Sequence, residues 1–343
     1  MGVENARILP KERLGAFLAA VAADGELIAP VRVGPEDVSF QPVSSPDEVE
    51  LDYVNSLLPP KRYVLPVHEC LFRFSRDDDR AWQLTPVLNV RKRVIFGIRS
   101  CDVTAMNFLD SFHAKEFDDI YYQTRRRNTT LISIACAEAG EHCFCVCCEG
   151  GPFLDCGFDL QLTDLEHKYL VELGSETGCE IVRGNEELLE AAGEADLRRR
   201  HEIHEEAKQK LEQASFMAAA IRRVTGDRAP EGFWANWGQR CISCTGCTHV
   251  CPTCSCFDVV DGRDVRMRHW DSCQLAGYTR EASGHNPRGL PADRVKRRFY
   301  HKLSHRYIEI DGRHGCVGCG RCVTTCPANI GMVNVVTQMR KPS

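Results

Sequence analysis

The chain has 343 residues, with 43 lysines and arginines against 48 aspartates and glutamates, and a formal net charge of −5. This length suffices for two or three domains. The contents of 43% hydrophobic and 27% charged residues are those of an ordinary globular protein. The charge gives no indication of nucleic-acid binding, and no apolar run has the length of a membrane span. Because thiolates must be reduced to bind metal, the twenty cysteines predict a cytoplasmic location.

The first apolar stretch, residues 14–23, follows basic residues and therefore resembles the core of a signal peptide. Its hydrophobic residues recur three and four positions apart, which is the spacing of a helix, and Glu12 interrupts the basic segment. We predict an amphipathic helix here. Strands are predicted at residues 27–33 and 61–74, on either side of a connection rich in proline and serine.

Two continuous apolar runs follow at residues 93–98 and 130–135, and each is typical of a strand that is buried on both faces. A helix is predicted between them, with Asp102 as its N-cap and its end near Phe112. The two runs are about thirty residues apart, which is the length of a β-α-β unit. The N-terminal part is therefore expected to be an α/β or α+β domain with a partly parallel sheet.

A cysteine follows each of these runs, Cys101 after the first and Cys136 after the second. The carboxyl ends of parallel strands meet at one edge of a sheet, where open α/β sheets bind their ligands. Cys143 and Cys145 come soon afterwards, in a C-x-C spacing that lets both thiols reach one site. We predict that these four cysteines bind a [4Fe–4S] cluster; a zinc site and buried apolar cysteines are the alternatives. Three neighbouring cysteines leave the choice of ligands open: Cys147, Cys148 and Cys156.

Residues 169–184 are expected to form two short strands around glycines, and residues 186–224 a charged helical segment. Beyond them, one cysteine pattern occurs twice, at residues 241–252 and 316–327. Both copies read C-x-x-C-x-x-C-x-x-x-C-P, the bacterial-ferredoxin pattern for a [4Fe–4S] cluster. Three cysteines at this spacing surround three corners of the cubane, and the small residues between them let backbone N–H groups approach the sulfides.

The ligands are expected to cross between the two motifs, because the cysteine before the proline ligates the other cluster in two-cluster proteins. One predicted set is Cys241, Cys244, Cys247 and Cys326; the other is Cys316, Cys319, Cys322 and Cys251. A structural zinc site explains neither the third close cysteine nor the proline. A disulfide framework does not suit a chain without a convincing secretion signal.

The predicted division is a domain at 1–200 with the upstream cysteine site, a helical linker at 201–235, and a two-cluster ferredoxin-like domain at 236–343. The last domain has a long insert at 257–312. Three cysteines in or near this insert receive no predicted role: Cys254, Cys256 and Cys273. The sequence contains no glycine-rich dinucleotide fingerprint and no P-loop, so neither flavin nor nicotinamide is expected to bind this chain.

Several phrases carry a resemblance to a known family. They are Gly-Ile-Arg-Ser-Cys-Asp at 97–102, Cys-Pro-Thr-Cys-Ser-Cys-Phe-Asp at 251–258 and Trp-Asp-Ser-Cys-Gln at 270–274. In these segments the chain resembles the iron–sulfur β subunit of cytoplasmic NAD(P)-linked [NiFe] hydrogenases, the sulfhydrogenases. The electron-transfer subunit of anaerobic sulfite reductase contains the same module. The resemblance covers roughly residues 90–335, and the upstream Cys147, Cys148 and Cys156 depart from its pattern.

The resemblance implies a subunit that holds no nickel and performs no bond-making chemistry. It implies that electrons pass between a flavin-containing, NAD(P)H-reactive subunit and a catalytic or small hydrogenase-type subunit. The alternative setting is an anaerobic sulfite reductase or a heterodisulfide-reductase-type complex. The residues alone favour the same role, because a chain with several clusters and no substrate motif transfers single electrons. A substrate-binding cluster would have three protein ligands, whereas both ferredoxin-type sites have four.

Overall fold

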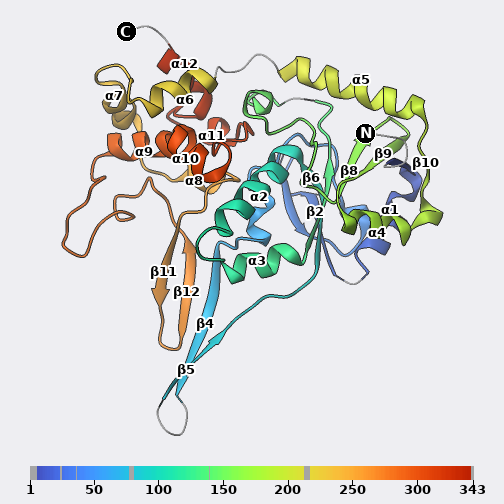
Figure 1. Cartoon of the computed structure of the whole chain (residues 1–343), viewed down its shortest axis with the longest axis horizontal. Helices are drawn as coiled ribbons and strands as arrows, with labels where there is room; N and C mark the ends of the chain where they lie inside the picture. Colours follow the sequence, from blue (N-terminus) through green and yellow to red (C-terminus); the bar gives the residue numbers. More distant parts are fainter. Residues whose placement is uncertain are drawn as a thin grey trace.

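The computed structural model describes residues 6–23, 25–35, 37–76, 81–138, 140–211 and 217–340. An eight-stranded sheet lies at one end, helices of the C-terminal region lie at the other, and a four-stranded sheet projects from between them (Figure 1). The larger sheet has the strand order β10 (Glu190–Ala191), β1 (Ala6–Pro10), β9 (Lys168–Leu173), β8 (Leu160–Asp164), β7 (Thr129–Ile134), β6 (Arg93–Arg99), β2 (Glu26–Arg32) and β3 (Val38–Pro42).

The centre of this sheet is parallel. Strand β6 pairs in parallel with β2 and with β7, and β7 pairs in parallel with β8, while the outer pairs are antiparallel. Every residue of β6 is buried, which accounts for its continuous apolar sequence. The predicted partly parallel sheet is confirmed, and so is the pairing of the two apolar runs as neighbours.

Helices cover both faces of the sheet. Side chains of α2 (Ser100–His113) and α3 (Ile120–Arg127) pack with Ile95 of β6 in one core. Side chains of α1 (Leu14–Val21) and α4 (Glu176–Arg183) pack with Val94 and Phe96 in another. The alternation follows from the two-residue repeat of a strand. The amphipathic helix predicted at residues 14–23 is α1, which buries Phe17 and Leu18.

Three local predictions were wrong. Helix α2 has Arg99 at its N-cap position, because the Asp102 carboxylate is used in a buried ion pair instead. The strand predicted at 61–74 is β4 (His68–Arg76) alone, since two prolines start a 3₁₀ turn at Pro60–Tyr63. The second strand predicted within 169–184 is helix α4, whose first turn is capped by the Ser175 hydroxyl, which accepts a hydrogen bond from the Gly178 N–H.

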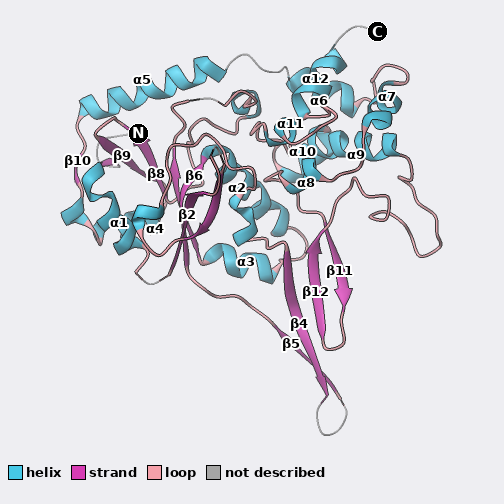
Figure 2. Ribbon diagram, turned by 180° about the vertical axis from the view of Figure 1, so that it is seen from behind, coloured by secondary structure: helices cyan, strands magenta, loops and turns pink. Residues whose placement is uncertain are grey.

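The C-terminal region is mainly helical. Its helices are α5 (Glu194–Leu211), α6 (Met217–Thr225), α7 (Phe233–Arg240), α8 (Gly246–His249), α9 (Pro291–Leu303), α10 (His305–Asp311), α11 (Arg321–Thr324) and α12 (Met332–Arg340). Helix α5 lies along the N-terminal domain, where Ile203 packs against Ala6 and Ile8 (Figure 2). The segment predicted to be helical at 186–224 forms α5 and α6 only from Glu194 onward, because Glu190–Ala191 is strand β10, paired with β1. Residues 212–216 between the two helices lie outside the described residues. Helices α6, α7, α9 and α12 share a core around Trp237 and Phe299, which Phe144 and Cys148 of the N-terminal region also join.

The four-stranded sheet combines strands that are far apart in the sequence. Its order is β11 (Phe257–Asp261), β12 (Val265–Trp270), β4 and β5 (Trp82–Pro86), and β12 pairs antiparallel with β4. The insert between the ferredoxin motifs therefore extends a hairpin of the N-terminal region. Both outer strands, β5 and β11, are exposed along their whole length.

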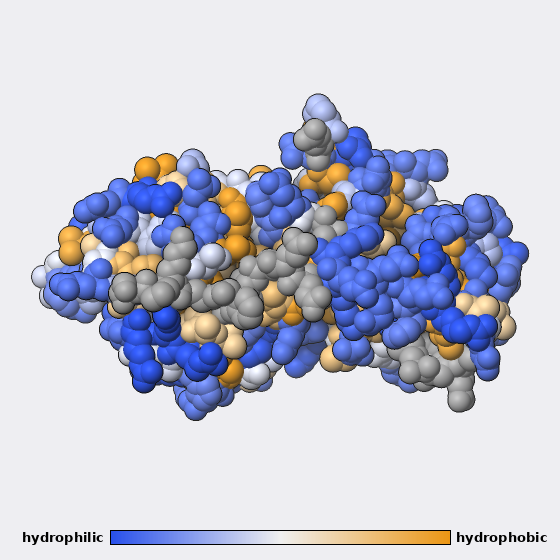
Figure 3. Space-filling view, turned by 90° about the horizontal axis from the view of Figure 1, so that it is seen from above, coloured by the Kyte–Doolittle hydropathy of each residue, from blue (hydrophilic) through white to orange (hydrophobic). Residues whose placement is uncertain are grey.

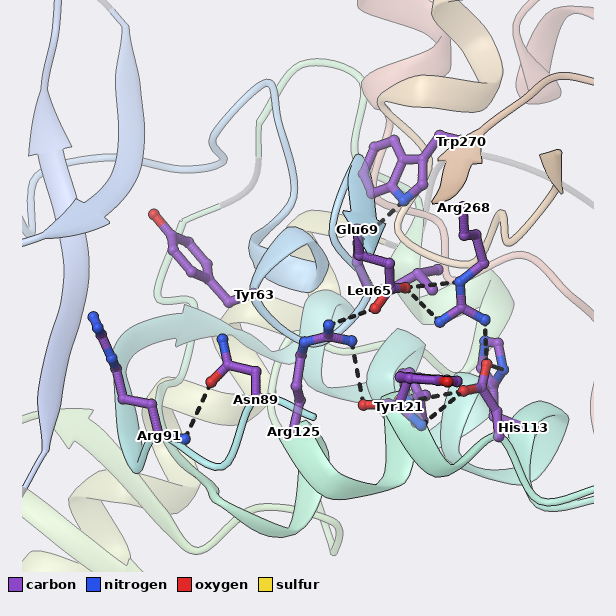
Figure 4. A network of polar contacts seen from close by, with 12 residues as sticks. Tyr63, Leu65, Glu69, Asn89, Arg91, His113, Tyr121, Arg125, Arg268 and Trp270 are labelled. Carbon is purple, nitrogen blue, oxygen red and sulfur yellow. Dashed lines mark hydrogen bonds and ion pairs between the residues drawn. The ribbon is translucent and has the colours of Figure 1, made fainter. Parts of the chain in front are cut away.

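A buried polar network holds the base of this sheet against the N-terminal domain (Figure 4). Arg268 of β12 donates from Nε to the Glu69 carboxylate at 2.7 Å and also pairs with Asp119, the N-cap of α3. Arg125 pairs with Glu69, and His113 lies 3.3 Å from Asp119. Although burial opposes it, hydrogen bonds from His113 and Arg268 hold the pKa of Asp119 well below its usual range. Each buried charge thus has an opposite charge beside it, as burial requires.

The surface is mixed in character. Hydrophilic residues predominate on the face shown in Figure 3, with smaller hydrophobic groups between them. None of the helices in the described part of the chain combines the length and the apolar character that a membrane crossing requires.

Candidate iron–sulfur sites

Four motif cysteines line one cavity between α7, α8 and the segment after α11. We call them the proximal group: Cys241, Cys244, Cys247 and Cys326. The loop that carries the first three bends through left-handed conformations at Ser243 and Thr245, with φ of 56° and 64°. The Ile330 N–H donates to the Cys326 Sγ at 3.2 Å. A backbone donor is thus aimed at one of the sulfurs, as an anionic cluster requires.

The remaining motif cysteines form a second set, which we call the distal group: Cys251, Cys316, Cys319 and Cys322. Burial raises the pKa of Cys319 and of Cys322, and the nearby Cys251 sulfur adds to both increases. A hydrogen bond from Cys148 lowers the pKa of Cys316, and the nearby Cys251 sulfur opposes this change. Cys251 therefore lies beside the second motif although it belongs to the first, and the cavity of the proximal group is not lined by it.

The four cysteines predicted upstream, which we call the upstream group, also lie together: Cys101, Cys136, Cys143 and Cys145. Cys101 is in the first turn of α2, and Cys136 follows β7. Burial raises the pKa of Cys145, and the neighbouring Cys136 and Cys143 raise it further. Burial raises the pKa of Cys101, and the nearby Asp102, Cys319 and Cys136 raise it further. The sheet therefore brings both strand-end thiols and both loop thiols to one edge.

The distal group contacts both of the others. Cys101 of the upstream group shares a small apolar cluster with Val317 and Cys319. The two loops interlock, because Phe144 N–H donates to the Gly318 carbonyl at 2.8 Å and a Cβ at Gly318 would lie 2.5 Å from the Phe144 carbonyl oxygen. On the other side, the distal group lies near the proximal group. Burial raises the pKa of Cys247, and the nearby Cys322 raises it further.

A buried ion pair fixes the contact between the distal and upstream groups. The Arg321 guanidinium donates two hydrogen bonds to the Asp102 carboxylate, both 2.7 Å long, and each side chain is 2% exposed. Its Nε donates to the Ser56 carbonyl at 2.6 Å. Arg321 comes two residues after Cys319 in the second motif, and Asp102 comes directly after Cys101 on α2. The ion pair therefore joins two segments that each carry a predicted cluster ligand.

Three buried cations surround the distal and proximal groups. Lys302 donates to Gly315 O and to Thr253 Oγ1, both at 2.8 Å, and the neighbouring Cys251 and Cys254 outweigh burial and raise its pKa. Lys61 donates to the carbonyls of Cys251 and Cys254 at 2.7 and 2.5 Å, although burial lowers its pKa to about 8.

The third cation, Arg298, lies between the two groups. It is electrostatically coupled to Cys247 and to Cys322, and it lines the cavity of the proximal group. Its Nη1 donates to Ile330 O at 3.0 Å, but within the described residues its buried Nε has no hydrogen-bond partner. Unpaired buried cations are costly. Anionic iron–sulfur clusters at the two groups would offset this cost, so the residues present fit the cofactor that the motifs indicate.

None of the twenty cysteines forms a disulfide. Within the described ranges, no three His, Cys, Asp or Glu side chains gather in the arrangement that holds a single metal ion. A cubane has a different requirement, because each of its four irons takes one thiolate and the ligands surround a larger body.

Comparison with known proteins agrees with this geometry. Residues 240–330 match the 4Fe-4S dicluster domain family, a range that includes both motifs and the insert. Over 338 residues the chain is 33% identical to the sulfhydrogenase 2 subunit beta of Pyrococcus furiosus, covering 97% of this chain and 98% of that protein. The chain belongs to the sulfhydrogenase beta-subunit family. The predicted resemblance is thus confirmed. The dicluster domain implies two [4Fe–4S] clusters, and membership of the family implies electron transfer.

In this member of the sulfhydrogenase beta family, several cysteines lie outside the three groups. Cys148 is fully buried and contacts Cys316, whereas Cys156 is exposed. Cys70 lies on β4 and Cys179 on α4, both half-buried. The cysteine motifs do not single out the three buried cations, because a lysine or arginine side chain is normally exposed to solvent.

Proposed function

We propose that this chain relays single electrons through three [4Fe–4S] clusters, bound by the upstream, distal and proximal groups. We propose that it does so between a flavin-containing, NAD(P)H-reactive subunit and a catalytic or small subunit of a hydrogenase-type complex in the cytoplasm. The observation that carries the proposal is the gathering of twelve cysteines into three groups, of which the distal group contacts both others. The name of the relative, a sulfhydrogenase subunit, supports partners of this kind.

The protein would set the cluster potentials through charge and hydrogen bonds. When bound, the clusters would supply the electron-accepting orbitals. Lys61, Arg298 and Lys302 stabilise added negative charge, because they are cations buried beside the distal and proximal thiols. They therefore favour the reduced state of those two clusters.

Both ends of the relay lie near the surface, as electron exchange with partner proteins requires. At the proximal end, Cys244 is exposed and the adjacent Ile242 is 70% exposed. At the upstream end, Cys136 borders an open groove together with Tyr53 and Arg99. We place one partner subunit at each end.

We also propose the domain division 1–200, 201–235 and 236–343. The hydrophobic cores support it: two lie around the eight-stranded sheet, and a third lies mainly among α6, α7, α9 and α12. The pairing of β4 with β12 joins the outer two domains through the insert at 257–312.

Metal content tests the three-cluster proposal. Protein prepared without oxygen is expected to contain about twelve irons per chain, because each cluster holds four. Cys136→Ala is expected to leave about eight, since it removes an upstream ligand, while the matched control Cys179→Ala retains all. Eight irons in the unchanged chain, with or without one zinc, would contradict the upstream cluster.

The isolated chain is expected to be redox-active but catalytically inactive towards hydrogen, sulfite and NAD(P)H. It carries no motif for binding any of these reactants. Reversible bleaching of the cluster absorbance by dithionite, together with the absence of turnover in assays of the pure chain, would agree with a relay. Turnover of any of the three substrates by the chain alone would contradict it.

A further inference from the structure

Three thiols that the relay does not use line one cavity. Cys254, Cys256 and Cys273 face it from the insert, and the two phenylalanines Phe108 and Phe112 face it from α2. The third wall is helix α9, which contributes three basic residues: Arg298, His301 and Lys302. The same cavity thus contains free thiols and buried positive charge.

The hairpin of the insert brings two of these thiols into contact. Phe257 pairs with Trp270 at the end of β11 and β12, and the Asp271 N–H donates to the Cys256 carbonyl at 2.9 Å. Cys273 follows two residues beyond Asp271, so the hairpin brings its side chain into the cavity that Cys256 also lines, where the two thiols interact. Two thiols that line one small cavity can approach each other to the bonding distance that a disulfide requires.

The two thiols differ in their surroundings. Hydrogen bonds from Cys273 and Tyr278 to the Cys256 sulfur lower the pKa of Cys256 to about 6, although burial opposes the change. The same contact raises the pKa of Cys273. Gln274 donates from Nε2 to the Cys273 Sγ at 3.4 Å, and its amide also donates to the Arg294 carbonyl at 2.9 Å. One thiol of the pair is thus more readily deprotonated than the other. This arrangement favours oxidation to a disulfide, because the thiolate is the reactive form of a cysteine.

The third thiol connects this pair to the relay. Cys254 lies in the same cavity, and its side chain contacts that of Cys251, a predicted ligand of the distal cluster. The Cys254 N–H also donates to the Cys251 carbonyl at 3.3 Å. The cavity therefore lies next to the distal group.

We propose that Cys256 and Cys273 form a redox-active dithiol–disulfide pair that exchanges two electrons with the iron–sulfur relay. The electron exchange rests on the proposed function, whereas formation of the disulfide does not. Oxidation joins the two sulfurs in one S–S bond and releases two protons and two electrons. Each [4Fe–4S] cluster accepts one electron, so two clusters of the relay together accept the two electrons. Reduction by two clusters reverses each step.

A site for a single metal ion is the competing interpretation of these cysteines. Cys254 already contacts Cys251, and only two thiols remain for a site in the cavity. No group of His, Cys, Asp or Glu within the described ranges has the arrangement of a single-ion site, and this cavity is included in that part of the chain. The direct contact between the two remaining thiols favours the disulfide.

The first experiment measures the thiols of the intact iron-loaded chain. Samples are equilibrated without oxygen in oxidised and reduced dithiothreitol at varying ratios, then alkylated, digested and mapped by mass spectrometry. A linked peptide containing Cys256 and Cys273 is expected in oxidising buffers and is expected to disappear in reducing ones. Cys273→Ser is expected to abolish the linked peptide with iron content unchanged, and the matched control Cys179→Ser to retain it.

The second experiment measures coupling to the clusters. Oxidised protein is titrated with dithionite while cluster absorbance is recorded, and the unchanged chain is expected to take up two more electrons than Cys273→Ser. Absence of the linked peptide at every buffer ratio would overturn the proposal, as would loss of about four irons in Cys273→Ser, which would identify a cluster ligand. Equal electron uptake by the two proteins would overturn the exchange with the relay. The iron content of the unchanged chain tests the relay separately.

Discussion

Cys251→Ala is expected to remove the cluster of the distal group and to leave the cluster of the proximal group in place, although Cys251 belongs to the first motif. The reason is geometric. The cavity of the proximal group is lined by Cys326 of the second motif and not by Cys251. Cys251 instead lies beside Cys316, Cys319 and Cys322. The iron content is expected to fall by about four atoms per chain, the content of one cubane.

The mirror variant makes this test sharper. Cys326→Ala is expected to remove the other cluster, so each variant retains the spectrum that the other loses. Electron paramagnetic resonance of the dithionite-reduced proteins distinguishes the two, and Cys179→Ala serves as a control for replacing a cysteine elsewhere. Loss of the proximal signal alone in Cys251→Ala would show that each motif binds its cluster independently.

The parts of the sites that the sequence could predict are those set by local spacing. The proximal and distal groups could be predicted because the three cysteines of a C-x-x-C-x-x-C loop come together wherever that loop folds. The placement of Cys101 and Cys136 at one edge followed from the parallel pairing of β6 with β7, which two buried apolar runs indicate. In both cases the chemistry depends on neighbours in the sequence or on adjacent strands.

The remainder depends on contacts between distant segments. No periodicity indicates that β12 pairs with β4, because both strands have polar, partly exposed sequences and their pairing is fixed by the buried Arg268–Glu69 contact. Nor does the sequence show that Asp102 meets Arg321 rather than capping α2. An aspartate near a helix start is normally a cap. Here the buried guanidinium competes for it, and a charged partner wins because an unpaired buried cation is costly.

That ion pair leads to the second large expected effect. Asp102→Asn is expected to destabilise the chain by about 3–5 kcal/mol, the usual cost of breaking a buried ion pair by removing one partner. Asparagine preserves the shape of the side chain but leaves the Arg321 charge without its carboxylate. Unfolding in guanidinium, followed by tryptophan fluorescence, measures the loss. Because Arg321 also lies beside Cys319, the uncompensated charge is expected to raise the reduction potential of the distal cluster as well.

A double variant separates the ion pair from simple packing. Asp102→Leu combined with Arg321→Met replaces both charges by apolar groups of similar size and is expected to recover most of the lost stability, because a buried ion pair contributes little beyond an apolar pair. The double variant also removes the positive charge, so the increase in the potential of the distal cluster is expected to disappear. Asp102→Asn with an unchanged unfolding midpoint would show that the pair does not hold α2 against the second motif. Stability restored without a return of the potential would mean that the charge of Arg321 does not act on the cluster.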